Sequence, residues 1–210
     1  MATWLTGAKE ILLIDDVNQF SLIDSLNFFE MQYIRRNLVT TVTKELLLTY
    51  RNPMDVALTL NEVYSGVYSS KIWVQSLRLE TYSDANIPKD LPNIFYLTYT
   101  QVEKESLIIQ TFGKGKGTRV LTIDEAQGLT SEGTLIMRIA AKNKLHDHVS
   151  HAVVAMTRHT VSSAYYTDDD EDAIGRCIRR AVAASENKIK GNNAKMAIRI
   201  FTIFKSKYKK

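Results

Sequence analysis

Short apolar runs alternate along this chain with segments whose apolar residues recur at helical spacing. Such runs, bounded by turn residues, are typical of buried strands, and apolar positions three and four apart are typical of helices. Strands that alternate with helices of this length favour an α/β fold, in which helices cover both faces of a mostly parallel sheet. Strands are expected within residues 10–15, 71–82, 93–100, 118–124, 133–140 and 162–167, and helices within 54–65, 101–115, 149–160 and 170–188.

The composition is that of a globular protein with a core of ordinary size. Of the 210 residues, 45% are hydrophobic and 24% are charged. No apolar run approaches the roughly 20 residues that a membrane-spanning helix needs. The first residues lack the basic start and apolar stretch of a signal peptide, and a single cysteine, Cys177, excludes an internal disulfide framework. We therefore expect a reduced, cytoplasmic protein.

Charge is distributed unevenly along the chain. Residues 1–170 carry 16 Lys/Arg and 20 Asp/Glu, whereas residues 171–210 carry 11 and 3. A basic tail of this kind can attract phosphate backbones or anionic lipid headgroups, or it can be a solvated, frayed terminus. The acidic run Asp168–Asp172 is expected to be a solvated linker and the start of a helix, with a cation-binding cluster as the alternative.

The stretch "VLTIDEAQG" (Val120–Gly128) raises the possibility of a magnesium site, because ATPases use an apolar strand that ends in two carboxylates for this purpose. Such a site needs a phosphate cradle of the form G-x-x-x-x-G-K-[ST] on an earlier strand-to-helix turn. The sequence contains no such string, and the glycine-rich "FGKGKGTRV" leads into a strand, which is typical of a flexible basic turn. No metal site is therefore expected within this chain.

Other enzyme classes find little support in the sequence. His146, His148, His151 and His159 lie near one helix but lack a further metal ligand at suitable spacing, and no serine stands in a nucleophile elbow. Polar clusters follow three strands, at "DDVNQ", "TYTQ" and "DEAQG". Ligands gather at the carboxyl ends of the strands of a parallel sheet, so these clusters predict a working edge.

Two of these strings, read together, resemble a known family. "LTIDEAQGLT" (Leu121–Thr130) and "HAVVAMTRHT" (His151–Thr160), followed by "YYT", resemble motifs V and VI of superfamily 1 RNA helicases. The resemblance is to the replication proteins of alphavirus-like positive-strand RNA viruses, such as tobamoviruses and closteroviruses. Upstream, "TYRNPMDV" (Thr49–Val56) resembles motif IV, "YLTYTQVEKESL" (Tyr96–Leu107) the element that follows it, and "LLIDDVNQF" (Leu12–Phe20) motif III, with Asp15 in place of the usual glycine.

The resemblance implies a RecA-like domain, a three-layer arrangement of a mostly parallel sheet between helices, here with a C-terminal helical basic tail. Family members have two such domains, with ATP between them and single-stranded RNA across both. Residues 1–43 would be the end of the first domain, including motif III, and residues 44–167 the second domain with motifs IV to VI. Residues 168–210 would be an acidic linker, a helix and a basic tail. The missing phosphate cradle would then belong to the first domain.

The resemblance also implies roles for individual residues. Arg158 would be an arginine finger that stabilises charge on the transferred phosphoryl group, Arg51 a second γ-phosphate contact, and Gln19 a γ-phosphate sensor. Asp124 and Glu125 would shape a turn between nucleotide and RNA. For Arg158 the alternative is a salt bridge on a helix surface, and for the threonines after the 93–100 strand it is ordinary strand-end capping. The implied nucleotide-binding residues are Asp16, Gln19, Arg51, Gln127, Gly128 and Arg158, and the implied RNA-binding residues are Thr98, Thr100, Gln101, Thr122, Gln127, Thr130 and His159.

We therefore expect half of an NTP-dependent viral RNA helicase, with ATP or GTP and Mg²⁺ bound mainly by the missing first domain, so that this chain alone is inactive. The expected partners are single-stranded RNA, the N-terminal RecA-like domain, and viral polymerase and capping domains at membrane-associated replication complexes in the host cytoplasm. The alternatives are an RNA- or partner-binding module without its own catalysis, and a structural domain of a replicase.

Overall fold

The computed structural model of the chain describes residues 48–61, 63–64, 69–72, 75–82, 86–141 and 144–184. The strand expected within 10–15 lies outside these residues. The described elements, in chain order, are β1 (Leu48–Pro53), α1 (Met54–Leu60), β2 (Ser69–Ile72), β3 (Leu77–Glu80), β4 (Ile94–Thr98), α2 (Gln101–Ile109), β5 (Arg119–Thr122), β6 (Ser131–Met137), the 3-10 helix η2 (Lys144–Asp147), α3 (Val149–Met156) and β7 (His159–Tyr166), followed by a helix over residues 173–184.

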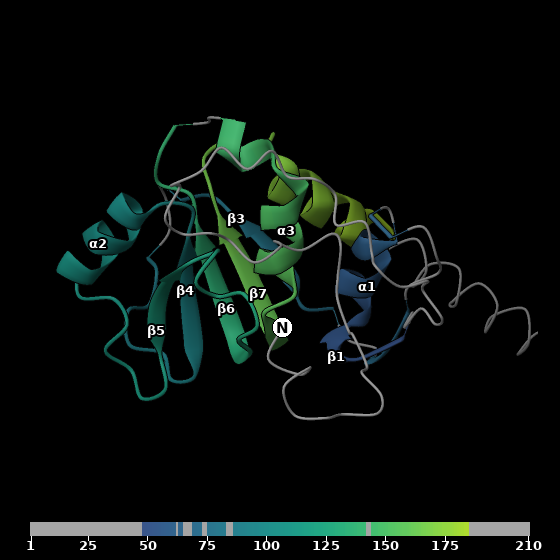
Figure 1. The fold of residues 1–210 in the computed structure, drawn as a ribbon, viewed down its shortest axis with the longest axis horizontal. Coiled ribbons are helices and arrows are strands. Elements are labelled where there is room, and N and C mark those ends of the chain that lie inside the picture. The colour runs from purple at the N-terminus through teal and green to yellow at the C-terminus, as the bar shows by residue number, and fades with distance from the viewer. Residues whose placement is uncertain are drawn as a thin grey trace, which may run out of the picture.

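A five-stranded parallel sheet forms the centre of the molecule (Figure 1). Its strand order is β3-β7-β6-β4-β5, and each neighbouring pair runs parallel. In β4, for example, Leu97 pairs with Leu121 of β5 and with Ile136 of β6. β1 and β2 form a separate parallel pair. Because parallel neighbours need crossover connections, the sheet matches the alternation of strands and helices in the sequence.

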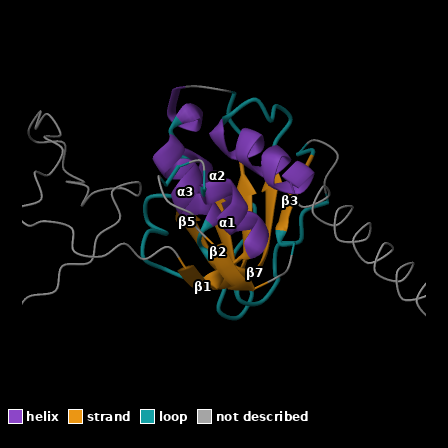
Figure 2. Cartoon of the chain, turned by 90° about the vertical axis from the view of Figure 1, so that its right-hand side faces the viewer, coloured by secondary structure: helices purple, strands orange, loops and turns teal. Residues whose placement is uncertain are grey.

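Helices cover both faces of the sheet, as the alternation of side chains along its strands requires. Phe95 and Leu97 of β4 pack in one hydrophobic cluster with α1, α3 and the 173–184 helix, whereas Tyr96 packs in a second cluster with Leu107 of α2. Figure 2 shows α1 and α3 together on one side of the strands. The predicted fold is thus confirmed as an α/β, RecA-like arrangement of three layers.

The helices begin where local signals place them, but α1, α2 and α3 end four to six residues before the ends of the expected ranges, and His159 and Thr160, expected in a helix, belong to β7. α1 follows Pro53, whose fixed φ suits a helix start, and it buries Val56 and Leu60 as expected. α2 begins at a capping box in which Thr100 and Glu103 satisfy one another's backbone N–H groups. None of the helices in the described segments has the length and apolar character needed to cross a membrane.

Two further expectations about single elements were wrong in detail. The run within 71–82 is two strands, β2 and β3, which belong to different sheets. Val149, expected on the apolar face of a helix, is 52% exposed, because α3 buries its later residues, from His151 to Met156, on all sides.

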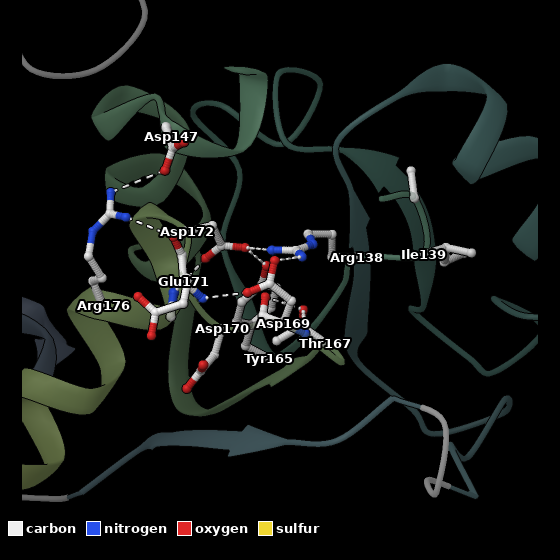
Figure 3. A network of polar contacts seen from close by, with 12 residues as sticks. Arg138, Ile139, Asp147, Tyr165, Thr167, Asp169, Asp170, Glu171, Asp172 and Arg176 are labelled. Atoms are coloured by element: carbon white, nitrogen blue, oxygen red, sulfur yellow. Dashed lines mark hydrogen bonds and ion pairs between the residues drawn. The ribbon is translucent and has the colours of Figure 1, made fainter. Parts of the chain in front are cut away.

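A buried ionic network anchors the chain after β7 to the end of β6 (Figure 3). Arg138 binds the carboxylates of Asp172 and Asp169, with N–O distances of 2.5 and 2.8 Å. The Tyr165 hydroxyl also donates to Asp172, whose second oxygen accepts the Gly175 N–H at 2.8 Å and so caps the 173–184 helix. Burial alone lowers the pKa of Arg138, but its bonds to Asp172 and Asp169 raise that pKa above the usual value.

The acidic run is therefore only in part the solvated linker that its composition suggests. Glu171 is exposed, but Asp172 is fully buried. The difference arises because Arg138, which is distant in sequence, forms an ion pair with Asp172 that offsets the desolvation cost of burying the carboxylate. Ile174, Ile178 and Ala181 of the following helix lie in the same cluster as α1 and α3, so this helix is part of the domain core.

Replacing Asp172 by alanine is expected to lower the free energy of unfolding by about 3 kcal/mol, because Arg138 would stay buried with part of its charge unpaired. Urea unfolding of the 210-residue chain measures the change. The matched control is Glu171→Ala, which removes an exposed carboxylate and is expected to change stability by about 0.5 kcal/mol or less. Equal losses for the two variants would show that the buried pair is not a stabilising anchor.

Candidate functional site

Three segments that are far apart in sequence, the strand β1 and the loops before β6 and β7, meet beside the starts of β6 and β7. The Arg51 guanidinium donates from Nη1 to Thr130 Oγ1 at 3.2 Å, and Asn52 Nδ2 donates to the Thr157 carbonyl at 3.0 Å. The backbone N–H of Ser131 donates to the Arg158 carbonyl at 2.8 Å. The structure thus brings together the segments around residues 51, 130 and 158, which the sequence linked only by resemblance.

Arg158 lies inside this junction and is only 1% exposed. Its Nε donates to the Val154 carbonyl at 3.0 Å, and its terminal nitrogens donate to the Leu129 carbonyl at 3.4 Å and to Thr157 Oγ1 at 2.6 Å. A helix-surface salt bridge, the alternative weighed for Arg158, does not fit this burial. In this conformation the guanidinium is folded back toward the domain.

Arg51 is half-buried in β1 and points its guanidinium at the loop before β6. Its backbone N–H donates to Thr49 Oγ1, which fixes the strand locally. The Arg51 Nε is buried and has no hydrogen-bond partner within the described residues. A guanidinium beside the Thr130 hydroxyl forms a donor set suited to phosphoryl oxygens.

His159 follows Arg158 and is completely buried. Its Nε2 lies 2.8 Å from Ser76 Oγ, in the loop before β3. Burial lowers the pKa of His159 to about 4, with Arg51 acting in the same direction and Asp55 in the opposite one. The imidazole is therefore neutral at pH 7.

The turn over residues 123–128 starts at the end of β5. The Glu125 carboxylate accepts the Thr122 N–H at 2.9 Å and binds Lys104 of α2 at 2.7 Å. Burial opposes ionisation of Glu125, but the bonds from Lys104 and Thr122 lower its pKa overall. Gly128 has a φ of +78° and open space beside it, so the chain there can approach a ligand closely.

Asp124 is placed differently from its neighbour Glu125. Its Oδ1 lies 3.5 Å from His151 Nε2, and burial and the charge of Glu125 raise its pKa. His151 is buried, and its pKa is lowered to about 4, so its imidazole is neutral at pH 7. Across the described segments, His, Cys, Asp and Glu side chains nowhere gather in a group of three that could hold a metal ion.

The polar residues after β4 form a helix cap. Thr98 is fully buried, and its hydroxyl donates to the Thr100 carbonyl at 3.2 Å. The Glu103 carboxylate accepts the N–H groups of Tyr99 and Thr100, and also those of Ile139 and Ala140 after β6. Gln101 is exposed. Glu103 was not singled out from the sequence, although the T-x-x-E spacing is a recognised capping signal.

The clusters "TYTQ" and "DEAQG" lie at the carboxyl edge of the sheet as predicted, but the candidate residues taken together lie at two opposite edges. Thr98, Thr100, Gln101 and Thr122 stand at the carboxyl ends of β4 and β5. The second group, Arg51, Thr130, Arg158 and His159, stands beside the amino ends of β6 and β7. Residues 123–130 connect the two edges, and Gln127 and Gly128 lie in this connection. Asp16 and Gln19 lie outside the described residues.

Between about pH 7 and 5 the free energy of unfolding is expected to fall as the pH falls. The pKa values of His151 and His159 are about 4 in the folded chain, below the ordinary value of 6.5, so the unfolded chain binds more protons in this range. Each histidine contributes a slope of at most about 1.4 kcal/mol per pH unit. Urea unfolding at several pH values measures this slope. His159→Gln should reduce it, and an unchanged slope in that variant would contradict the assignment.

Comparison with known proteins adds a family to this geometry. The profile of the viral superfamily 1 RNA helicase core domain matches residues 3–167. The chain is 31% identical over 197 residues to the replicase large subunit of Potato mop-top virus, which covers 87% of this chain and 10% of that protein. It is 29% identical over 182 residues to replicase protein 1a of Grapevine leafroll-associated virus 3, with 79% of this chain and 8% of that protein covered.

A third relative is replication protein alpha-A of Barley stripe mosaic virus, 30% identical over 188 residues that cover 79% of this chain and 16% of that protein. The chain therefore spans a small part of the length of these relatives. Among solved structures, the arterivirus helicase, nonstructural protein 10, aligns with a TM-score of 0.42 at 17% identity, over 63% of this chain and 27% of that chain.

Proposed function

The chain belongs to the viral superfamily 1 RNA helicase family, and on that premise we propose that it is the second RecA-like half of an NTP-dependent RNA helicase that acts in viral genome replication. The observation that carries this proposal is the junction in which Arg51, Thr130 and Arg158 meet. Helicases of this kind couple two sites, and residues 123–130 run from one candidate edge to the other. Residues 1–43 would complete the first domain.

At the nucleotide, this chain would supply positive charge and hydrogen-bond donors. ATP or GTP, with Mg²⁺ held mainly by the first domain, supplies the phosphoryl group to be transferred. Arg158 would act as the arginine finger, with Arg51 as a second donor to the γ-phosphate. Asp16 and Gln19 would face the same nucleotide from the other side.

Arg158 must turn outward to reach a phosphate. Three of the hydrogen bonds that hold it inward go to two carbonyls and a hydroxyl, which are neutral acceptors. Charge-assisted bonds to phosphoryl oxygens are about twice as strong as neutral ones. Binding of nucleotide between the two domains would therefore draw the guanidinium out of the junction.

At the RNA, the candidates separate by exposure. The exposed Gln101 and Thr130 and the half-buried Thr100 and Gln127 would contact the sugar-phosphate backbone without reading sequence. The remaining three, Thr98, Thr122 and His159, are buried and would act by holding the loops in place. Gly128 would let the turn approach the nucleotide and the RNA closely.

The partners follow from this role. The chain would work with the first RecA-like domain and with viral polymerase and capping domains, at membrane-associated replication complexes in the host cytoplasm. It would have no NTPase activity alone, because the phosphate cradle is absent from its sequence.

In the complete helicase, Arg158→Ala is expected to lower kcat for NTP hydrolysis by about 10³-fold, in keeping with other arginine fingers. Arg158→Lys should recover little, because an ammonium lacks the paired donors of a guanidinium. Steady-state hydrolysis in the presence of RNA measures the change, and Arg78→Ala, an exposed arginine of β3, is the control. An Arg158→Ala enzyme with near-normal kcat would refute the finger.

The basic C-terminal segment tests the competing binding-module function. Because the 173–184 helix belongs to the core, a truncation should begin at Ser185 and remove eight Lys/Arg and one Glu. In a helicase, RNA binding should fall modestly and NTP hydrolysis should keep its kcat. A loss of most RNA affinity, together with most of its salt dependence, would favour a binding module.

A further inference from the structure

A relay of three buried residues links α1, the loop before β3 and the start of β7. Asp55, in the first turn of α1, is 2% exposed. One of its oxygens accepts the backbone N–H groups of Ser76 and Leu77, at 2.5 and 2.7 Å. The other accepts the Ser76 hydroxyl at 2.9 Å. Every one of these groups donates to Asp55, so the carboxylate acts as an acceptor throughout.

This arrangement fixes the proton on His159. Ser76 gives its hydroxyl hydrogen to Asp55, so Ser76 Oγ must accept from His159 Nε2, which lies 2.8 Å away. A neutral imidazole that carries its proton on Nε2 presents Nδ1 as a bare acceptor. His159 is 0% exposed, so bulk water does not satisfy this atom.

Two buried polar atoms in this region lack partners within the described residues: His159 Nδ1, an acceptor, and Arg51 Nε, a donor. A buried polar atom without a partner costs free energy, and native proteins keep few of them. Their chains are held close, because Asn52 bonds to the Thr157 carbonyl. The charge of Arg51 also acts on the His159 ring.

We propose that His159 is a positioning residue for Arg51, whose Nε–H donates to His159 Nδ1 in the nucleotide-bound state. Arg51 would then leave Thr130, and both of its terminal nitrogens would face the phosphate. Asp55 and Ser76 would hold the imidazole proton on Nε2, so that Nδ1 stays available as an acceptor. The proposal rests on the proposed role of Arg51 as a phosphate contact, and it adds three residues to that site.

Substitutions of His159 separate this role from simple packing. In His159→Gln the amide can still reach Ser76 but offers no acceptor near Nδ1, whereas in His159→Asn the amide oxygen stands close to the Nδ1 position. In the complete helicase, His159→Gln is expected to lower kcat about tenfold, the loss of one hydrogen bond to a charged group, with KM for NTP nearly unchanged. His159→Asn should retain more of kcat, although it loses the bond to Ser76.

The decisive test is a double-mutant cycle for kcat with Arg51→Ala. If His159 acts through Arg51, His159→Gln has no further effect once Arg51 is gone, which would support the proposal. A full tenfold effect in the Arg51→Ala background would overturn it, as would losses in His159→Gln and His159→Asn that follow their thermal stability alone. If Arg51→Ala itself leaves kcat unchanged, Arg51 is not a phosphate contact. That result would refute the proposed role of Arg51 and, with it, the positioning role of His159.

A second readout does not depend on activity. Nitrogen-15 NMR of the imidazole of His159 in the 210-residue chain is expected to show the proton on Nε2. Ser76→Ala removes the acceptor for the Nε2 proton, so in this variant the proton is expected to be shared between Nε2 and Nδ1. A proton found on Nδ1 in the unsubstituted chain would overturn the proposal, because that atom could not accept from Arg51.

Discussion

The parallel pairing of β6 with β7 is the interaction on which the candidate site depends. It begins where the Ser131 N–H donates to the Arg158 carbonyl, and it continues through Leu135 and Ala164 into the buried centre of the sheet. This pairing brings the end of the 123–130 connection against the end of α3. Asn52 then adds β1 to the same junction through the Thr157 carbonyl. The 123–130 connection and the end of α3 are thus joined through backbone groups, and β1 is joined to them through the Asn52 side chain.

Two buried arginines in this domain show how their acceptors suit them to different tasks. Arg138 is bound by two carboxylates and ties the chain after β7 to the sheet, so its release would be costly. Three of the bonds that hold Arg158 inward go to neutral oxygens of Val154, Leu129 and Thr157. Under the proposed function, Arg138 stays bound within the domain, whereas Arg158 exchanges these three neutral oxygens for phosphoryl oxygens.

Much of the fold could be predicted from sequence because its determinants are local. Apolar runs and helical spacing placed β4, β5, the later part of β7 and the starts of the helices, and Pro53 marked the start of α1. The split of the 71–82 run into two sheets depends on long-range pairing, which local pattern does not encode. The burial of Asp172 was missed for the same reason, since its partner Arg138 lies 34 residues away.

The candidate site was predicted less completely than the fold. The resemblance selected Arg51, Thr130 and Arg158, and the structure brings these residues together. The resemblance could not indicate that Arg158 is folded inward or that His159 is buried. Asp55 and Ser76 carried no sequence signal, because their role exists only once α1, β3 and β7 are assembled.

The central claim is that Arg158 leaves its internal acceptors to contact a phosphoryl group. The most direct measurement is an experimental structure of the complete helicase with RNA and an NTP transition-state analogue. The account predicts the Arg158 guanidinium within hydrogen-bond distance of the γ-phosphate mimic, with its bond to the Leu129 carbonyl broken. An Arg158 that still donates to Val154 and Leu129, with another group on the γ-phosphate mimic, would contradict it.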